Sequence, residues 1–304
     1  MKVLIIGGVA GGATAAARLR RLDESAEIIV LERGGFVSYA NCGLPYYIGG
    51  VIQEKEKLTL QTPESFWKRF RIEVRVQNEA VAIDPKNKMV TVRRLKDGSE
   101  YTETYDKLIL SPGAKAMRPN FPGIDNNHIF TLRTVEDTYR IREYIDKNHP
   151  QTATVVGGGF IGLEMAENLM EQGIDTALIQ RENQVMLPLD YDMACGIHAY
   201  LRKKGLHLYV EQTVEGFKQE DEKVVTLLKG GNSLSSDFVI LAIGVTPETH
   251  LAKQAGLSLG IRDSILVDEH MLTSDPDIYA VGDAVQVKNF VSGENSLIAL
   301  AGPA

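Results

Sequence analysis

Cys42 is one of two cysteines in the 304-residue chain, and its surroundings point to redox chemistry. It lies in the stretch SYANCGLPYYIGG at 38–50, with no second cysteine nearby to close a disulfide. Asn41 can cap a helix from Cys42 to about Ile48, which Gly49 can end. A thiol in the first turn of a helix feels the helix dipole, which favours the nucleophilic thiolate. The alternative is that Cys42 is only a small buried apolar residue.

Cys195, the other cysteine, lies in the helical pattern YDMACGIHAYLRKK, and we expect it to be a core residue only. Two cysteines cannot make a disulfide framework, so we expect the cytoplasm, which is reducing, as the setting. The chain has 44% hydrophobic and 24% charged residues, as is typical of a soluble globular protein.

The formal charge of −7 argues against nucleic acid or an anionic membrane as the main partner. No apolar stretch approaches the roughly 20 residues that are needed to cross a bilayer. We also expect no metal site.

The segment KVLIIGGVAGGATAAARLRRL predicts a strand, a glycine turn and a helix over 12–22, and the strand AEIIVLE follows and ends at Glu32. In the G-x-G-x-x-G spacing Gly7 and Gly12 fit, whereas Val9 replaces the middle glycine. Glycines let backbone N–H groups approach a pyrophosphate at a helix N-terminus, and a carboxylate can bond ribose hydroxyls. We therefore predict a dinucleotide site here, against the alternative of a plain glycine turn.

The pattern recurs about 150 residues later, as a strand over 153–156 and then Gly157, Gly159 and Gly162 in full register. A helix continues to about Gln172, and DTALIQ forms the next strand. Two dinucleotide folds imply two dinucleotides, which is what a flavin enzyme reduced by a nicotinamide needs.

Each glycine-loop unit is followed by a small β-meander and a returning strand, so we predict an α/β fold with two Rossmann-like domains. The expected division is 1–115 for the first part of a FAD domain, 116–244 for an NAD(P) domain, and 245–304 for a truncated second part of the FAD domain. The motif YAVGD places Asp283 after an apolar strand, where its carboxylate can bond a ribityl chain.

The order of these motifs resembles that of the pyridine nucleotide–disulfide reductase superfamily, and the match covers essentially the whole chain. The motifs that carry the resemblance are Gly7–Gly12, Cys42, SPG at 111–113, the second glycine loop at 157–162, AIG at 242–244 and YAVGD at 279–283.

Two positions narrow the resemblance. The glutathione reductase branch has two cysteines in a C-x4-C motif, whereas the residue five positions after Cys42 is Tyr47. SYANCGLPY resembles instead the single-cysteine branch of NADH peroxidases, NADH oxidases, coenzyme A disulfide reductases and NADH-dependent persulfide reductases. The peroxidases and oxidases carry a histidine in the first glycine loop, where this chain has Ala10; all six histidines lie beyond residue 127. Coenzyme A disulfide and persulfide reductases are thus the closest type.

The resemblance implies FAD and NAD(P)H as cofactors, with hydride passing to the flavin and the electrons reducing a mixed disulfide between Cys42 and its substrate. Phe160 matches an aromatic residue that shields the flavin until nicotinamide displaces it. Gln180 followed by Arg181 departs from the acidic NADH pattern, so we expect NADPH to be used at least as well as NADH. The implied cofactor-binding residues are Gly7, Gly8, Val9, Ala10, Gly11, Gly12, Glu32, Arg33, Ala80, Ser111, Pro112, Gly113, Arg133, Asp283, Ala301, Gly157, Gly159, Phe160, Ile161, Gly162, Glu164, Gln180, Arg181 and Gly244.

The substrate side of the resemblance is coenzyme A, as a disulfide, a persulfide or an adduct on Cys42. Thr14, Arg18 and Arg21 share one helix face, and their counterparts in coenzyme A disulfide reductases bind the phosphates. The positions that match Ser38 and Asn41 lie near the thiol end of the coenzyme. A solvated helix face is the alternative reading of the arginines. WKRFR at 67–71 is a second basic cluster for the same ligand, or only a charged helix end.

In the resembled family a dimerisation domain follows the motif ENSLIALAGPA, and some members add a rhodanese domain. We therefore expect this sequence to be a fragment of a homodimeric protein. The alternatives to disulfide reduction are an NADH oxidase or peroxidase that uses a Cys42 sulfenic acid, and a non-enzymatic flavin redox sensor.

Overall fold

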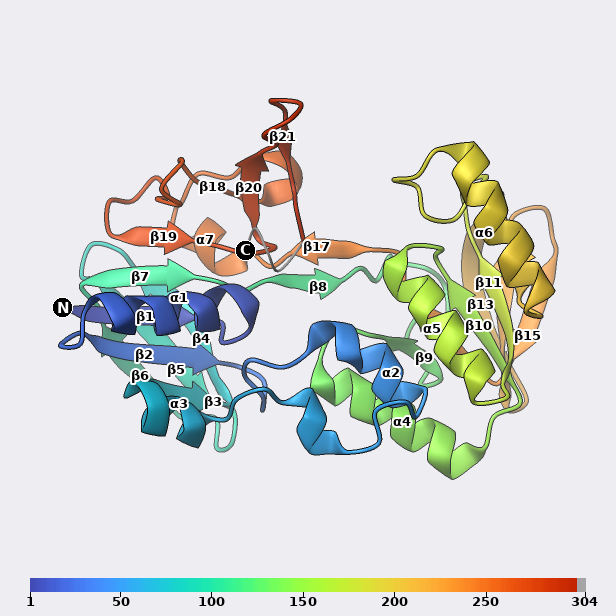
Figure 1. Cartoon of the computed structure of the whole chain (residues 1–304), viewed down its shortest axis with the longest axis horizontal. Helices are drawn as coiled ribbons and strands as arrows, with labels where there is room; N and C mark the ends of the chain where they lie inside the picture. Colours follow the sequence, from blue (N-terminus) through green and yellow to red (C-terminus); the bar gives the residue numbers. More distant parts are fainter. Residues whose placement is uncertain (300–304) are drawn as a thin grey trace. The chain divides into compact units, whose positions relative to one another are not determined.

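The computed structural model describes residues 1–299, which form two compact units (Figure 1). Unit 1 comprises 1–40, 59–115 and the residues from 246 onward, and unit 2 comprises 41–58 and 116–245. The short segment 41–58, which carries Cys42, belongs to unit 2, whereas the sequence analysis placed it in the first part of the FAD domain.

The sheet of unit 1 is parallel and has the strand order β19-β7-β1-β2-β3. Apolar runs such as KVLII in β1 are buried along nearly their whole length, as expected for a parallel sheet that is covered on both faces. One side packs against α1, and the other packs against the strands of the meander and α7. The strands are β1 (Lys2–Ile6), β2 (Glu27–Glu32), β3 (Glu73–Val76), β7 (Lys107–Leu110) and β19 (Ile278–Ala280).

The predicted strand 2–6 is confirmed, and the first helix begins two residues earlier than expected, at Ala10. The predicted meander is an antiparallel sheet of three strands. The remaining elements of unit 1 are α1 (Ala10–Leu22), α3 (Pro63–Phe70), β4 (Asn78–Asp84), β5 (Met89–Arg94), β6 (Glu100–Thr104), α7 (His250–Gln254), η3 (Ile261–Asp263), β18 (Ile265–Leu266), β20 (Val285–Lys288) and β21 (Asn295–Ser296).

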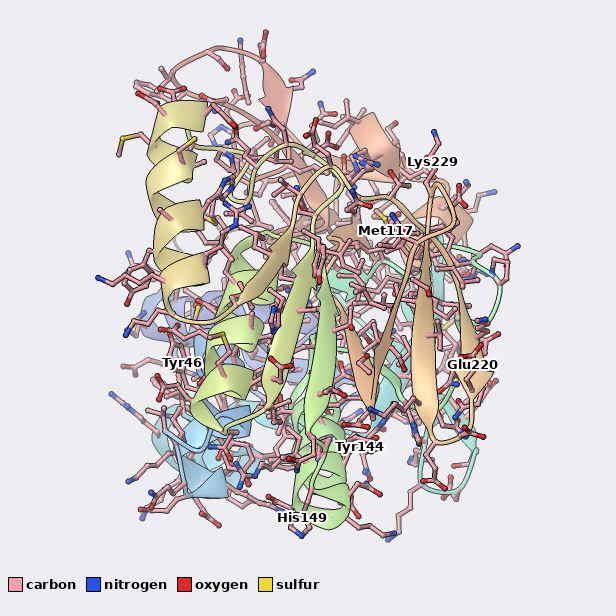
Figure 2. All side chains as sticks on the ribbon, turned by 90° about the vertical axis from the view of Figure 1, so that its right-hand side faces the viewer. Tyr46, Met117, Tyr144, His149, Glu220 and Lys229 are labelled. Carbon is pink, nitrogen blue, oxygen red and sulfur yellow. The ribbon has the colours of Figure 1, made fainter. Side chains whose placement is uncertain are left out.

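Unit 2 repeats the plan, with a parallel sheet in the order β12-β11-β10-β16-β9 and its own antiparallel meander, β13-β14-β15. Figure 2 faces this unit, with Tyr144 on α4 and Glu220 at the end of β13 labelled. Its sheet and meander strands are β9 (Ile129–Thr131), β10 (Thr152–Val156), β11 (Asp175–Ile179), β12 (His207–Tyr209), β13 (Val214–Glu220), β14 (Lys223–Leu228), β15 (Ser233–Ser236) and β16 (Phe238–Leu241).

The helices of unit 2 include the elements that carry Cys42 and Phe160. They are η1 (Asn41–Gly43), α2 (Leu44–Ile48), η2 (Lys55–Leu58), α4 (Val135–Asn148), α5 (Phe160–Glu171) and α6 (Tyr191–Lys203). The two strands β8 (Ala114–Ala116) and β17 (Val245–Pro247) pair with each other where the chain passes from one unit to the next. Within residues 1–299 no helix combines the length and apolar character that a membrane span requires.

Candidate active site

The glycine loop of unit 1 follows β1 at the carboxyl edge of the sheet. Gly7 has a φ of +99°, and a Cβ there would lie 1.9 Å from the carbonyl oxygen of Ser111. A Cβ on Gly12 would lie 1.9 Å from the carbonyl oxygen of Gly7. Only glycine fits at either position, because the loop, the first turn of α1 and the end of β7 touch through their backbones.

Val9, which departs from the glycine pattern, is the N-cap of α1 and has a φ of −101°. This φ is negative, so the position is not in the left-handed region that favours glycine. No side chain caps the N-terminus of α1, and its first turn contains no acidic residue. The N–H groups of this turn therefore suit an anion such as a diphosphate.

Glu32 stands at the end of β2, as predicted. Its Oε2 accepts the backbone N–H of Gly8 at 2.9 Å, and its Oε1 accepts that of Gly34 at 2.7 Å. A carboxylate at the end of the second strand of a dinucleotide fold is the group that can bond ribose hydroxyls.

Other predicted cofactor residues of unit 1 gather at the same sheet edge. Ser111 follows β7, and its Oγ would lie 2.9 Å from a Cβ on Gly11, so the SPG segment packs against the first turn of α1. Asp283 follows β19, and the N–H of Val281 donates to the carbonyl of Leu110 at 2.9 Å.

Three further predicted residues of unit 1 differ in their surroundings. Arg33 is exposed and faces Glu248 at 3.7 Å. Ala80 is buried within β4, in the core under the meander. Ala301 lies outside the described residues.

Unit 2 builds its glycine loop in the same way. Gly157 has a φ of +109°, and a Cβ there would lie 2.3 Å from the carbonyl oxygen of Ala242, at the end of β16. A Cβ on Gly162 would lie 1.9 Å from the carbonyl oxygen of Gly157. Gly159 is the N-cap of α5, and a Cβ built there would meet no described atom within 4 Å, so the N-terminus of α5 is open to a ligand.

Gln180 follows β11 and occupies the place that Glu32 has in unit 1. Its Oε1 accepts the N–H of Gly158 at 2.9 Å, and the residue is 8% exposed. The next residue, Arg181, has a side chain that is 75% exposed and pairs with Glu182 at 2.6 Å. Each unit therefore has the same type of hydrogen bond from its glycine loop to a side chain, but that side chain is charged in unit 1 (Glu32) and neutral in unit 2 (Gln180).

Phe160 is the first residue of α5 and is 62% exposed. Ile161 and Glu164 follow on the same helix, and burial, with the negative charge of Glu167 second, raises the pKa of Glu164. Arg133 follows β9 at the carboxyl edge of the sheet, where its N–H donates to Asp137 at 3.0 Å. Gly244 has a φ of +107° and stands just after β16.

Cys42 is a free and exposed cysteine, so the alternative of a buried apolar residue is wrong. Its predicted helix is shorter than expected, because Asn41–Gly43 forms a 3-10 turn and α2 begins only at Leu44. Gly43 is the N-cap of α2 and no side chain caps it, so the capping role predicted for Asn41 is wrong. The end at Ile48 is confirmed. Cys195 is also free and exposed, so the core role expected of it is wrong.

The predicted substrate residues divide between the units. Thr14, Arg18 and Arg21 lie exposed along α1 in unit 1. Ser38 belongs to unit 1 as well, and its N–H donates to the carbonyl of Gly8 at 2.9 Å. Asn41 belongs to unit 2, next to Cys42.

The sequence analysis missed His198. The loop after β11 folds back so that Nε2 of His198 accepts the N–H of Val185 at 3.2 Å. Val185 in turn packs on Gly158, where a Cβ would lie 2.7 Å from Cγ1 of Val185. Sequence spacing holds no signal for this contact, because an irregular loop brings the two residues together.

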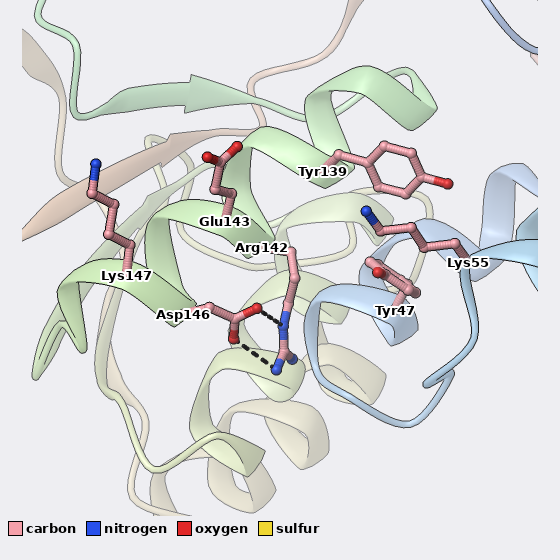
Figure 3. A pocket seen from close by; sticks show the side chains of 7 residues that line it. All are labelled: Tyr47, Lys55, Tyr139, Arg142, Glu143, Asp146 and Lys147. Atoms are coloured by element: carbon pink, nitrogen blue, oxygen red, sulfur yellow. Dashed lines mark hydrogen bonds and ion pairs between the residues drawn. The ribbon is translucent and has the colours of Figure 1, made fainter.

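A pocket and the potential metal ligands of the described residues add nothing to the predicted site. A pocket of about 400 Å³ between α2 and α4 contains none of the predicted site residues (Figure 3). Within residues 1–299 no group of three or more His, Cys, Asp or Glu side chains is arranged to hold a metal ion.

Comparison with known proteins gives a consistent result. A family profile described as pyridine nucleotide-disulphide oxidoreductase matches residues 1–300. The coenzyme A disulfide reductase of Staphylococcus haemolyticus is 37% identical over 284 residues, which are 93% of this chain and 63% of that protein. The chain thus spans less than two thirds of the length of this relative.

Three solved structures are also similar. Reduced Bacillus anthracis CoADR-RHD has a TM-score of 0.97 at 51% identity, and the match covers 99% of this chain and 54% of that chain. An NAD-dependent persulfide reductase from A. fulgidus has a TM-score of 0.96 at 36% identity, and the match covers 100% of this chain and 57% of that chain.

The third is an engineered water-forming NADPH oxidase bound to NADPH, made from an NADH oxidase of Lactobacillus brevis. Its TM-score is 0.94 at 31% identity, and the match covers 100% of this chain and 67% of that chain. Among its five replacements, an aspartate becomes alanine and the next residue, an alanine, becomes arginine.

Proposed function

The chain belongs to the pyridine nucleotide-disulphide oxidoreductase family, and from that premise we propose that it reduces a disulfide or persulfide of coenzyme A, or a related polysulfide, with NADPH or NADH. The observation that carries the proposal is Cys42, which is free and exposed. Cys195, the only other cysteine, stands on α6 and is free as well. The free state of both supports a disulfide partner for Cys42 that is supplied by the substrate.

The glycine loop of unit 1 fits FAD. The uncapped N-terminus of α1 suits the diphosphate, Glu32 is the type of residue that bonds a ribose, and Asp283 follows β19 at the same sheet edge. A bound flavin would supply the two-electron chemistry that links the nicotinamide to the disulfide. The chain itself binds and orients the groups around that chemistry.

Cys42 carries out the sulfur chemistry. Its thiolate attacks one sulfur of the substrate disulfide, the S–S bond breaks, and one thiolate leaves. Two electrons from NAD(P)H and one proton then cleave the disulfide between Cys42 and the bound half of the substrate. This second step releases a thiol and restores the Cys42 thiolate, so the cycle balances.

The exposed face of α1 supports coenzyme A as the substrate. Arg18 and Arg21 lie there without an acidic residue in the first turn of the helix, and guanidinium groups suit phosphates. The second basic cluster lies on α3, where the Arg71 guanidinium is 5.5 Å from the centroid of the Trp67 ring. This pair offers a charged aromatic surface for the same ligand.

We also propose that NADPH is used at least as well as NADH. Gln180 keeps the hydrogen bond to Gly158 without the negative charge that would repel a 2′-phosphate, and Arg181 follows it. The engineered NADPH oxidase supports this reading, because it gained the same type of pair, an uncharged residue followed by arginine. The interval from its replaced glycine to its replaced aspartate equals that from Gly162 to Gln180.

Two further proposals concern the full-length protein. We propose that it is a homodimer and that it works in the reducing cytoplasm. The second proposal is supported by the free state of both cysteines.

The test is an anaerobic stopped-flow experiment on the FAD-loaded full-length protein. The flavin is first reduced with NADPH and then mixed with coenzyme A disulfide, coenzyme A persulfide, hydrogen peroxide or oxygen. Reoxidation is expected to be fastest with a coenzyme A substrate. Fastest reoxidation by oxygen or peroxide would overturn the proposal in favour of an oxidase or peroxidase. Reoxidation by none of them would point to a redox sensor.

A further inference from the structure

The C-terminal end of α2 is held by side chains from two other helices of unit 2. Nη1 of Arg142, on α4, donates to the carbonyl oxygen of Ile48 at 2.9 Å. Nε2 of Gln172, the C-cap of α5, donates to the carbonyl oxygen of Gly49. The last carbonyls of a helix have no partner within the helix, so these two donors satisfy groups that the helix itself leaves unpaired.

Arg142 is itself fixed in place. Asp146, one turn further along α4, accepts from Nη2 at 2.9 Å and from Nε at 3.1 Å (Figure 3). Nη1 also lies 3.5 Å from Oε1 of Gln172, so the two donors are linked to each other. A planar guanidinium with five N–H groups can make all these contacts at once, and an ammonium cannot.

α2 and α5 meet without space between them beside this cluster. A Cβ on Gly49 would lie 2.1 Å from Oδ1 of Asn168, which is buried on α5. Nδ2 of Asn168 donates to the carbonyl of Glu164 at 2.8 Å, so this side chain cannot move aside freely. The approach of α2 to α5 is therefore set by backbone and by buried atoms rather than by flexible side chains.

The opposite ends of the same two helices carry the residues of the proposed reaction. α2 follows directly on the turn that contains Cys42, and α5 begins at Phe160, after the open glycine loop. We propose that Arg142 is a positioning residue, which fixes the thiol of Cys42 in unit 2 by holding the far end of α2 against α4 and α5. This inference rests on the function proposed for Cys42.

The pocket beside Arg142 offers matched controls. Lys147 and Glu143 line it and stand on the same helix (Figure 3). Among the described residues neither makes a hydrogen bond to α2. Lys147→Gln therefore removes the same charge from the same pocket and leaves the carbonyls of α2 satisfied.

The test compares Arg142→Gln, Arg142→Lys and Lys147→Gln in the FAD-loaded full-length protein, all in a Cys195→Ser background. The first readout is the rate of alkylation of Cys42 by iodoacetamide, which needs no turnover. The second is kcat and KM for coenzyme A disulfide, and the third is the rate of flavin reduction by NADPH.

Arg142→Gln is expected to change the alkylation rate at least threefold and to lower kcat about tenfold to 100-fold, as expected for a reacting group misplaced by about 1 Å. KM and flavin reduction stay unchanged. Arg142→Lys restores part of kcat, because one ammonium can reach either the carbonyl of Ile48 or the carboxylate of Asp146 but not both. Lys147→Gln behaves as the parent. Wild-type alkylation and kcat in Arg142→Gln, or an equal loss in Lys147→Gln, would overturn the proposal.

Gln172→Leu provides a second variant if Arg142→Gln does not fold. It removes the donor to Gly49 and is expected to shift alkylation in the same direction. No shift in that variant contradicts the positioning role. The two hypotheses separate cleanly: if the parent protein reduces no disulfide but Arg142→Gln still alters alkylation, the proposed function fails and the positioning role stands.

Discussion

The backbone N–H of Val185 donates to Nε2 of His198 at 3.2 Å, which requires that this ring nitrogen carry no proton. The bond joins α6 to the loop that follows Arg181. Because Val185 packs on Gly158, the same bond supports the second glycine loop. Protonation would replace an acceptor with a donor that faces another donor.

We therefore expect coenzyme binding to weaken at acid pH through His198. Burial first, and the positive charge of Arg202 second, lower the pKa of His198 below its ordinary value of 6.5. The neutral form of His198 is favoured in the folded state. Its contribution to the free energy of unfolding is therefore complete above about pH 6.5 and is lost as the pH falls through the pKa of the folded state. This contribution is about 1.4 kcal/mol for each unit by which the folded pKa lies below the unfolded pKa.

Titration of the NADPH dissociation constant between pH 5 and pH 7.5 checks this. His198→Gln keeps an acceptor that does not titrate, so it should flatten the profile. His207→Gln is the control, since His207 is exposed and pairs with Asp175 at the surface. A profile that is equally steep in His198→Gln would contradict the role of His198.

Cys42→Ser should abolish the reduction of coenzyme A disulfide and leave flavin reduction by NADPH nearly intact, because the thiolate acts only after the electrons have entered the enzyme. Rapid mixing with NADPH and with the disulfide measures the two half-reactions separately. Cys195→Ser, which alters the other exposed thiol, should keep both. Near-normal turnover of Cys42→Ser would move the chemistry to another group.

Arg18→Ala and Arg21→Ala should raise KM for coenzyme A disulfide more than for a small disulfide that lacks phosphates. A hydrogen bond to a charged group contributes about 1.5–3 kcal/mol, so each variant is expected to raise KM by roughly tenfold to 100-fold. Steady-state kinetics with both disulfides measure the effect. Arg93→Ala, at the exposed end of the meander strand β5, provides a charge-matched control. The same increase for both disulfides would remove the phosphate role.

Gln180→Glu should lower kcat/KM for NADPH selectively, because a carboxylate at this position repels the 2′-phosphate. Arg181→Ala is expected to have the same sign and a smaller effect, since Arg181 already pairs with Glu182. Glu182→Gln frees that arginine and should favour NADPH. Comparing kcat/KM for NADPH and NADH in each variant decides the matter; a tenfold preference of the unaltered protein for NADH would contradict the reading of Gln180 and Arg181.

The sequence predicted the α/β class and both glycine loops because strands and helix N-termini leave local patterns. Gly7 and Gly157 are required by positive φ and by backbone contact, and such requirements are visible in a single sequence. The tolerance for Val9 was not visible, because its negative φ depends on the path of the whole loop.

The sequence could not predict how Cys42 is held. Asn41 resembles a helix cap, yet the 3-10 turn moves the start of α2 to Leu44. The residues that hold this helix, Arg142 and Gln172, come from segments about 100 residues away and from a different sequence pattern. Contacts of this kind depend on tertiary packing, and no periodicity records them.

The matching hydrogen bonds of Glu32 and Gln180 also bear on how one polypeptide tells a prosthetic group from a diffusible coenzyme. Both are adenine dinucleotides, and the two loops have nearly the same backbone, with φ values of +99° and +109° at their first glycines. Shape alone therefore discriminates weakly between the two molecules. On the function proposed here, a carboxylate in one loop and a neutral amide in the other would sort the two molecules by the phosphate on the adenosine ribose.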